Sequence, residues 1–345
     1  MASNRMQPLY RGKSAVPAGA AAPAEIWLMT NPYSLTSAQD SLAPEPGEEN
    51  SMQPACVMTF NASDPSGAAG LYADALAIAS VGAHALPIFT GSYARDTGEI
   101  FEYFGMSEEA VTAQARAVLE DVPVHVFKVG FVGSPENLGA IAAMASDYED
   151  VPLVAYMPSL SWWDESRIDA YLDAFAEMLL PQTTILVGHY STLWRWLLPD
   201  WNGQSNPQAR DIARAAQALG TPYTLVTGIP LPDQWIDNVL ASPDEILASE
   251  KFERIEAVFV GAGDTLSAAL AALLASGSDL GSATHEALSY LDRCLLGGFR
   301  PGMGHMLPDR LFWAQPEILS ADDTDLQSDD LPETFTQELP HVTKH

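Results

Sequence analysis

Residues 259–277 read FVGAGDTLSAALAALLASG, a stretch in which a turn of small residues leads directly into an apolar helix. Positions 261, 262 and 263 carry nothing bulkier than a methyl group, and position 264 is an aspartate. The first N–H groups of a helix lack partners within the helix, and that end carries about half a positive charge. The stretch therefore predicts either an anion site at Gly261, Ala262 and Gly263 with Asp264 as an adjacent base, or a helix that Asp264 only caps.

A second glycine-bearing turn lies in residues 55–74, ACVMTFNASDPSGAAGLYAD. Residues 55–61 read as a buried strand, and the turn is followed by a helix with Leu71, Ala75, Ile78 and Ala79 on one face. Small residues in such a turn let a ligand approach the backbone, and Asp74, about two turns into the helix, could reach over it. The structural alternative is an Asp-Pro turn that simply precedes a helix.

Strand and helix patterns alternate through the rest of the chain. Expected strands are 84–91, 124–132, 152–157, 183–188 and 222–228, and expected helices are 107–120, 135 onward, 164–180, 207–219, 264–277 and 282–294. Residues 235–241 and 252–261 read as a returning antiparallel pair. This alternation predicts an α/β domain, in which a mostly parallel sheet is covered by helices on both faces and ligands bind at the carboxyl ends of the strands.

Composition limits the partners of the chain. Its 345 residues have a formal net charge of −29, which argues against nucleic acid and anionic membranes as partners but not against a small anionic ligand. The two cysteines, Cys56 and Cys294, are expected to be reduced core residues. With neither an apolar run of about 18 residues nor a secretion signal, a cytoplasmic protein is expected. Residues 1–53 and the acidic residues 317–345 read as disordered tails around a domain at 54–316.

Three stretches together carry a resemblance to a known family. MTFNASDPSGAAGLYADALAIASVGAHALPIFTG, VLEDVPVHVFKVGFVGSPENL and GAGDTLSAALAALLASG resemble the hydroxymethylpyrimidine/phosphomethylpyrimidine kinases of thiamine biosynthesis, in the ribokinase-like superfamily. The resemblance covers residues 55–138 and 257–291. It implies a ribokinase-like three-layer α/β/α sandwich, often a homodimer. It also implies transfer of the γ-phosphate of ATP, with Mg²⁺, to 4-amino-5-hydroxymethyl-2-methylpyrimidine, to its monophosphate, or to both.

The resemblance also implies roles for residues on the pyrimidine side. Asp264 stands where this family usually has a cysteine and where the wider superfamily has its aspartate base. Asp74 matches an aspartate that hydrogen-bonds the pyrimidine, and Ala62 replaces a glycine at the substrate's edge. Arg95 replaces a glutamine and would favour an acceptor that carries a phosphate or carboxylate. Phe131 replaces a methionine.

The chain departs further from the family on the nucleotide and magnesium side. Met157, His189, Thr192 and Thr227 stand where the family has aspartate, asparagine, glutamate and lysine. Arg300, in the glycine-rich stretch GFRPGMGH, is a candidate cation for a triphosphate, or else a surface arginine. No set of metal ligands at a suitable spacing is expected, and His189 and His305 are not expected to bind metal.

The divergent middle of the chain is rich in tryptophan, at positions 162, 163, 194, 196 and 201. These side chains are interpreted as core or interface packing, as a rebuilt base-stacking site, or as a plug in the nucleotide groove. The predicted function is a pyrimidine kinase. Two alternatives remain: a catalytically degenerate pyrimidine-binding or regulatory protein, and a kinase for another small alcohol such as pyridoxal or a sugar.

Overall fold

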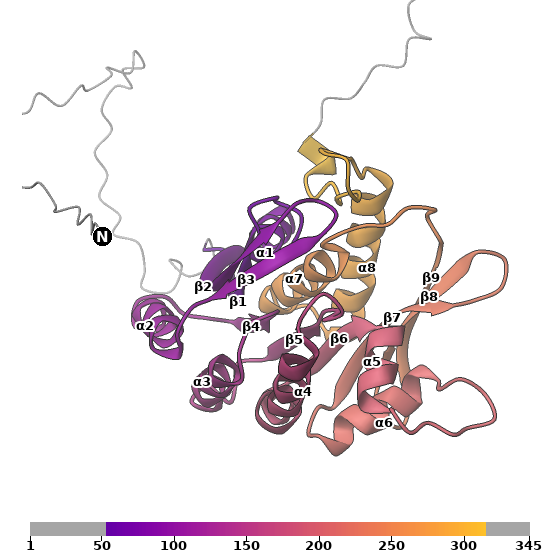
Figure 1. The fold of residues 1–345 in the computed structure, drawn as a ribbon, viewed down its shortest axis with the longest axis horizontal. Coiled ribbons are helices and arrows are strands. Elements are labelled where there is room, and N and C mark those ends of the chain that lie inside the picture. Colours follow the sequence, from indigo (N-terminus) through magenta and orange to yellow (C-terminus); the bar gives the residue numbers. More distant parts are fainter. Residues whose placement is uncertain (1–52, 315–345) are drawn as a thin grey trace, which may run out of the picture. The chain divides into compact units, whose positions relative to one another are not determined.

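The computed structural model describes residues 53–314, and the tails predicted at 1–53 and 317–345 lie outside these residues, apart from Gln53. Within the described part, nine strands form one sheet with the order β3-β2-β1-β4-β5-β6-β7-β8-β9 (Figure 1). Their bounds are β1 Cys56–Ser63, β2 His84–Arg95, β3 Ile100–Gly105, β4 Val126–Val129, β5 Leu153–Met157, β6 Ile185–His189, β7 Tyr223–Pro230, β8 Trp235–Ala241 and β9 Ile246–Glu253. The six strands from β2 to β7 in this order are parallel, and β3, β8 and β9 are antiparallel to their neighbours.

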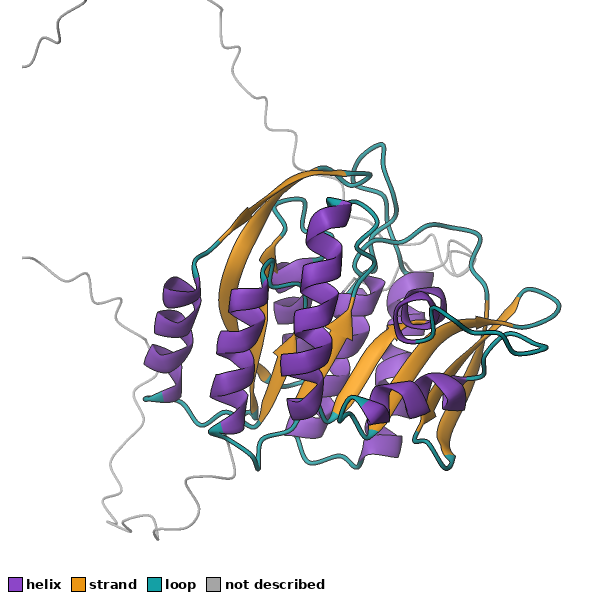
Figure 2. Ribbon diagram, turned by 60° about the horizontal axis from the view of Figure 1, so that its bottom comes forward, coloured by secondary structure: helices purple, strands orange, loops and turns teal. Residues whose placement is uncertain are grey.

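Helices cover both faces of the sheet (Figure 2). One face packs against α1 Gly70–Ser80, α7 Ala262–Ala275 and α8 Leu280–Leu296. The other packs against α2 Glu108–Leu119, α3 Pro135–Ser146, α4 Glu165–Ala174, α5 Tyr190–Leu197 and α6 Ala209–Ala218. Each face has its own hydrophobic cluster, so the predicted three-layer α/β/α sandwich with a mostly parallel sheet is confirmed.

Helix starts follow the local sequence closely. The side chains of Ser107, Ser134, Asp164 and Asp279 each accept a hydrogen bond from a backbone N–H in the first turn of α2, α3, α4 and α8. Such caps satisfy N–H groups that have no partner inside the helix. The helix predicted at 164–180 continues beyond α4 as a π-helical turn, Phe175–Leu179, and a short 3-10 turn, Leu180–Gln182.

Three details differ from the sequence prediction. The strand expected at 252–261 is β9 at Ile246–Glu253, because a tight turn in which Ser242 and Glu245 hydrogen-bond each other follows β8 and starts the pairing at Ile246. Strand β3 and helix α5 were not predicted. In α1 the buried face holds the predicted Ile78, but Ala73, Asp74 and Ala77 take the place of the predicted Leu71, Ala75 and Ala79, because the carboxylate of Asp74 has partners inside the protein.

The parallel strands bring their carboxyl ends to one edge of the sheet. Asn61, Phe131 and Tyr156 lie at or just beyond the ends of β1, β4 and β5, and α7 begins at the same edge. Cys56 and Cys294 are both buried and free, as expected. No helix among residues 53–314 combines the length and the apolar character needed to cross a bilayer.

Candidate functional site

The start of α7 has the geometry of an anion site. Gly261 is its N-cap residue and adopts a left-handed conformation (φ 82°), and a Cβ atom there would lie 1.8 Å from the carbonyl oxygen of Ala68. Only glycine fits such a position. No side chain caps the helix, and the N–H groups of Ala262, Gly263 and Asp264 make no hydrogen bond within the described residues. The donors are therefore available, and Asp264 is not the cap.

The Asp264 carboxylate is held by three donors from other parts of the chain. One oxygen, Oδ1, accepts hydrogen bonds from Asn61 Nδ2 at 2.8 Å and from Lys128 Nζ at 3.3 Å. The other, Oδ2, accepts one from the Gly70 N–H at 3.3 Å. The residue is 9% exposed, so this carboxylate is oriented by the protein and still reaches the surface of a pocket.

Asp74 lies behind Asp264 and is fully buried. Lys128 Nζ donates to both of its oxygens, at 2.7 and 2.9 Å, and Thr59 Oγ1 and Asn61 Nδ2 donate to Oδ2 at 2.6 and 3.1 Å. Burial raises the pKa of Asp74, and the ammonium of Lys128 opposes this rise. Burying a carboxylate costs free energy because it loses its water, and hydrogen bonds and an ion pair of this kind offset that cost.

Lys128 is the centre of this network. Its side chain has no exposed surface, and it forms ion pairs with both Asp74 and Asp264. Two carboxylates and one ammonium leave the group with one net negative charge. Lys128 is thus placed to orient Asp264 and to compensate part of the negative charge of the two carboxylates.

The first glycine turn is tied to the start of α7. Asp64 accepts hydrogen bonds from Ser66 N and Ala69 N at 2.8 Å each and forms an ion pair with Arg95 at 3.4 Å. Arg310, which is 4% exposed, donates to the carbonyl oxygen of Ala68 at 2.6 Å and to Thr265 Oγ1 at 2.8 Å. These bonds hold the two predicted turns side by side.

A pocket of about 640 Å³ opens over Asp264; we call it the Asp264 pocket. Its floor and walls combine aromatic rings with a few polar groups. They are Asn61, Ala69, Gly70, Tyr93, Arg95, Gly98, Glu99, Ile100, Phe131, Tyr156, Pro158, Ser159, Ser161, Trp162, Val258, Phe259, Val260, Gly261, Asp264 and His305. Phe131 packs against Tyr93 and Trp162, with ring centroids 6.0 and 5.4 Å away.

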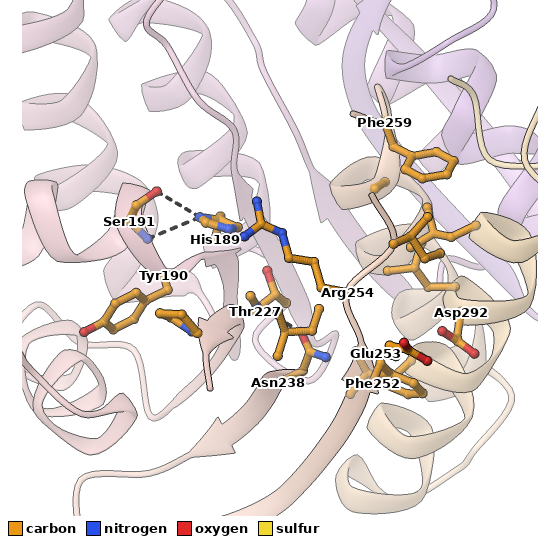
Figure 3. Close-up of a pocket in the computed structure, with 18 of the residues that line it drawn as sticks. His189, Tyr190, Ser191, Thr227, Asn238, Phe252, Glu253, Arg254, Phe259 and Asp292 are labelled. Carbon is orange, nitrogen blue, oxygen red and sulfur yellow. Dashed lines mark hydrogen bonds between the residues drawn. The ribbon is translucent and has the colours of Figure 1, made fainter. Parts of the chain in front are cut away.

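A second pocket of about 750 Å³ lies on the other side of the start of α7; we call it the His189 pocket (Figure 3). Its lining comes mainly from α5, the ends of β7 and β9, and α8. The residues are His189, Tyr190, Ser191, Trp194, Arg195, Asn206, Thr227, Gly228, Pro230, Ile236, Asn238, Phe252, Glu253, Arg254, Ile255, Ala257, Val258, Phe259, Ala262, Leu288, Leu291, Asp292 and Leu295. In Figure 3, Arg254 extends across the pocket toward His189, whose Nδ1 accepts from the Ser191 N–H at 3.2 Å.

The two pockets meet at residues 258–264. Val258 and Phe259 line both, Ala262 faces the His189 pocket, and Gly261 and Asp264 face the Asp264 pocket. Free N–H donors therefore lie between two cavities, with a carboxylate at the mouth of one. This arrangement can hold an anionic group between two ligands and accept a proton from one of them.

The structure places the residues predicted from the sequence in different environments. Arg95 and Phe131 line the Asp264 pocket, and Thr227 and His189 line the His189 pocket, where partial burial lowers the pKa of His189. Ala62 and Asp74 have no exposed surface.

The buried position of Asp74 differs from the direct substrate contact that the resemblance implied, because its carboxylate turns inward to Lys128. Arg300 is exposed and lies in neither pocket.

The five tryptophans have separate roles. Trp162 and Trp163 belong to the aromatic cluster around Phe131, and Trp196 packs against Phe175. Trp201 donates from Nε1 to the Ser205 carbonyl oxygen, and only Trp194 of the five lines the His189 pocket. The five side chains leave the His189 pocket open, so none of them plugs this cavity. The interpretation as packing is confirmed for Trp162, Trp163 and Trp196.

Sequence reasoning missed the roles of Asn61, Lys128, Arg254 and Arg310. A lysine inside an apolar strand pattern was a usable signal for Lys128, since a buried ammonium requires an acidic partner. Arg254 and Arg310 lie in stretches without a motif, so no local signal marks them.

The phosphomethylpyrimidine kinase family model matches residues 64–309, well over half of the chain. The chain belongs to the phosphomethylpyrimidine kinase family. It is 26% identical over 253 residues to a hydroxymethylpyrimidine/phosphomethylpyrimidine kinase of Streptomyces coelicolor, covering 73% of this chain and 92% of that one. It is 28% identical over 262 residues to the protein of that name in Mycobacterium tuberculosis, covering 74% and 93%.

Solved structures agree on the fold. A Bacillus subtilis pyridoxal kinase in complex with ADP has a TM-score of 0.67 at 20% identity, covering 76% of this chain and 99% of that one. A phosphomethylpyrimidine kinase from Clostridium difficile has a TM-score of 0.58 at 21% identity, covering 70% and 99%. The predicted ribokinase-like fold is thereby confirmed.

Proposed function

We propose that this protein transfers the γ-phosphoryl group of ATP to the hydroxymethyl group of 4-amino-5-hydroxymethyl-2-methylpyrimidine, to its monophosphate, or to both. The observation that carries the proposal is the pair of pockets that meet at the start of α7, with Asp264 facing one of them. Family membership supports the same activity. Both volumes, about 640 and 750 Å³, lie within the roughly 300–1,000 Å³ typical of sites for small ligands.

The acceptor would occupy the Asp264 pocket. Tyr93, Phe131 and Trp162 offer aromatic faces to a flat ring, and its hydroxymethyl group would point toward Asp264. The Arg95 guanidinium is already paired with Asp64, so it supports the turn as well as offering charge to an acidic acceptor.

ATP would occupy the His189 pocket. Apolar side chains from α8 and from the stretch after β9 suit the adenine ring, and the Arg254 and Arg195 cations suit phosphates.

In the reaction, the acceptor hydroxyl oxygen forms a bond to the γ-phosphorus as the bond between that phosphorus and the bridging oxygen of ADP breaks. The hydroxyl proton passes to the Asp264 carboxylate, and the leaving electron pair stays on ADP. The free N–H groups of Ala262, Gly263 and Asp264 would stabilise the charge on the phosphoryl oxygens.

The side chains of this site do not form a magnesium site by themselves. Residues 53–314 contain no cluster of three or more His, Cys, Asp or Glu side chains able to hold a metal ion. Asp264 already accepts hydrogen bonds from Asn61 and Lys128, and the positive charge of Lys128 disfavours a second cation there. Mg²⁺ would therefore have to arrive on the nucleotide phosphates, and no step of the reaction is assigned to it.

The test is an ADP-release assay with three acceptors offered separately: hydroxymethylpyrimidine, its monophosphate and pyridoxal. Turnover with either pyrimidine and at least tenfold lower kcat/KM with pyridoxal is expected. Preference for pyridoxal would support the alternative kinase. Calorimetric binding of a pyrimidine without any turnover would support the degenerate binding protein. The homodimer implied by the resemblance stays a prediction, which sedimentation velocity would test.

A further inference from the structure

Tyr156 is a polar side chain of the Asp264 pocket to which neither the sequence patterns nor the proposed reaction assigns a role. It is the second-last residue of β5 and lies at the carboxyl end of the strand. Lys128 Nζ lies 5.7 Å from the centroid of its ring, so the ring packs against the same buried network that holds Asp264.

The phenol oxygen of Tyr156 lies against the start of α7. A Cβ atom built on Gly263 would be 2.1 Å from it, so the phenol occupies the space that a side chain at this position would need. The N–H of Gly263 is one of the free donors described above. The glycine at position 263 therefore makes room for a hydroxyl group beside the anion site.

The Tyr156 hydroxyl makes no hydrogen bond to any described residue, and neither does that of Tyr93 in the same pocket, whereas two other tyrosines of this region have partners. Tyr171 accepts from the Val132 N–H at 3.2 Å, and Tyr103 donates to the Thr90 carbonyl oxygen at 2.8 Å. Burial, followed by the charges of Asp264 and Asp74, raises the pKa of Tyr156. The phenol consequently keeps its proton at neutral pH and remains an unused donor that faces a pocket.

We propose that the Tyr156 hydroxyl is a catalytic hydrogen-bond donor to the phosphoryl group as it is transferred at the start of α7. This rests on the proposed function. The phenol adds a side-chain donor to the backbone N–H groups, keeps its own proton, and strengthens its hydrogen bond as negative charge grows on the phosphoryl oxygens. Asp264 remains the base.

The first experiment is steady-state kinetics of Tyr156→Phe, which removes one oxygen and keeps the ring. Loss of one donor to developing charge should lower kcat about 10- to 100-fold and leave the acceptor KM within about threefold. Tyr148→Phe, the same change outside both pockets, should leave kcat within about twofold. Unchanged kcat in Tyr156→Phe overturns the proposal. So does a raised KM with unchanged kcat, because the phenol would then contact the acceptor instead.

The second experiment needs no turnover: calorimetric binding of inorganic phosphate to the full chain and to Tyr156→Phe. We expect wild-type binding in the millimolar range and at least fivefold weaker binding to the variant. Equal affinities, or no phosphate binding by the wild type, overturn the role of Tyr156. If the wild type phosphorylates no pyrimidine but the variant still binds phosphate more weakly, the proposed function fails and Tyr156 remains a phosphate ligand. If the pyrimidine is phosphorylated and both tests of the variant are negative, only the inference fails.

Discussion

The Asp264 pocket and the His189 pocket lie on opposite sides of one helix start, but their charged groups are held differently. In the Asp264 pocket, Asp264 pairs with the buried Lys128, and Arg95, whose side chain is 5% exposed, pairs with Asp64. In the His189 pocket, His189, Glu253 and Arg254 are exposed, and none of these three forms an ion pair with a described residue.

Under the proposed function, this difference separates two tasks. A base must be held in one orientation, and buried partners do this at the cost of desolvating charges. A nucleotide brings its own charge and shape, so flexible side chains at a pocket rim can close on it. Changes on the Asp264 side should therefore affect folding and kcat, and changes on the His189 side should affect nucleotide affinity.

The largest effect is expected from Lys128→Met, which leaves two carboxylates near each other without a cation. Breaking a buried ion pair costs about 3–5 kcal/mol. With Lys128 gone, burial raises the pKa of Asp74 without opposition. The unfolded chain, in which an aspartate has its usual pKa of about 3.9, then binds fewer protons than the folded one above that pH. The free energy of unfolding of the variant should therefore fall as pH rises from 5 to 8.

Urea denaturation at both pH values measures this. The control is the double variant Asp74→Asn, Lys128→Met, which removes the buried charge as well as its partner. It should be more stable than Lys128→Met at pH 8 and show a weaker pH dependence. A Lys128→Met protein as stable as the wild type would mean that the ion pairs contribute nothing to folding.

Asp264→Asn tests the role of Asp264 as the base, because asparagine has nearly the same size and shape but carries no carboxylate. Without a carboxylate to accept the hydroxyl proton, kcat should fall about 10²- to 10⁴-fold. Nucleotide Kd should change less than threefold, because the His189 pocket is untouched. Steady-state kinetics and calorimetry give the two values. A variant that keeps more than a tenth of the wild-type kcat shows that Asp264 is not the base.

Gly261→Ala tests the shared boundary of the two pockets. A left-handed conformation costs a residue with a Cβ about 1–2 kcal/mol, and the contact with the Ala68 carbonyl oxygen adds to this. The expected result is a loss of at least ~2 kcal/mol of stability by urea denaturation. Gly277→Ala is the matched control, since Gly277 also has a positive φ (91°) but a Cβ there meets no atom within 4 Å. Equal losses in both variants would show that the contact with Ala68 is unimportant.

The smallest effect is expected from Arg254→Ala, which removes an exposed cation from the His189 pocket. Nucleotide Kd should rise about three- to tenfold, or ~1 kcal/mol, with kcat nearly unchanged. Arg300→Ala, an exposed arginine outside both pockets, should leave Kd unchanged. If Arg300→Ala has the larger effect, the nucleotide lies elsewhere and the comparison between the pockets is incorrect.

Much of the fold could be predicted from the sequence because it depends on local patterns. Ser107 and Pro135 marked helix starts, and the buried strands followed apolar runs. The glycine turns around Asp264 were predicted as an anion site, and their donors are free. The environment of Asp74 could not be predicted, because its partner Lys128 is 54 residues away, and Lys128 also reaches Asp264 across 136 residues. The strand at 252–261 was misplaced because its apolar pattern competes with that of Ile246–Glu253, and hairpin geometry decided between them.

The sequence by itself determined the alternation of strands and helices, the glycine at position 261 and the carboxylate that follows it, because each depends on neighbours within one turn. Only the tertiary structure decided that Asp74 turns inward, that Tyr156 faces the helix start, and that two open pockets meet there. These contacts depend on strand order and register, which bring distant residues together and which no local pattern encodes.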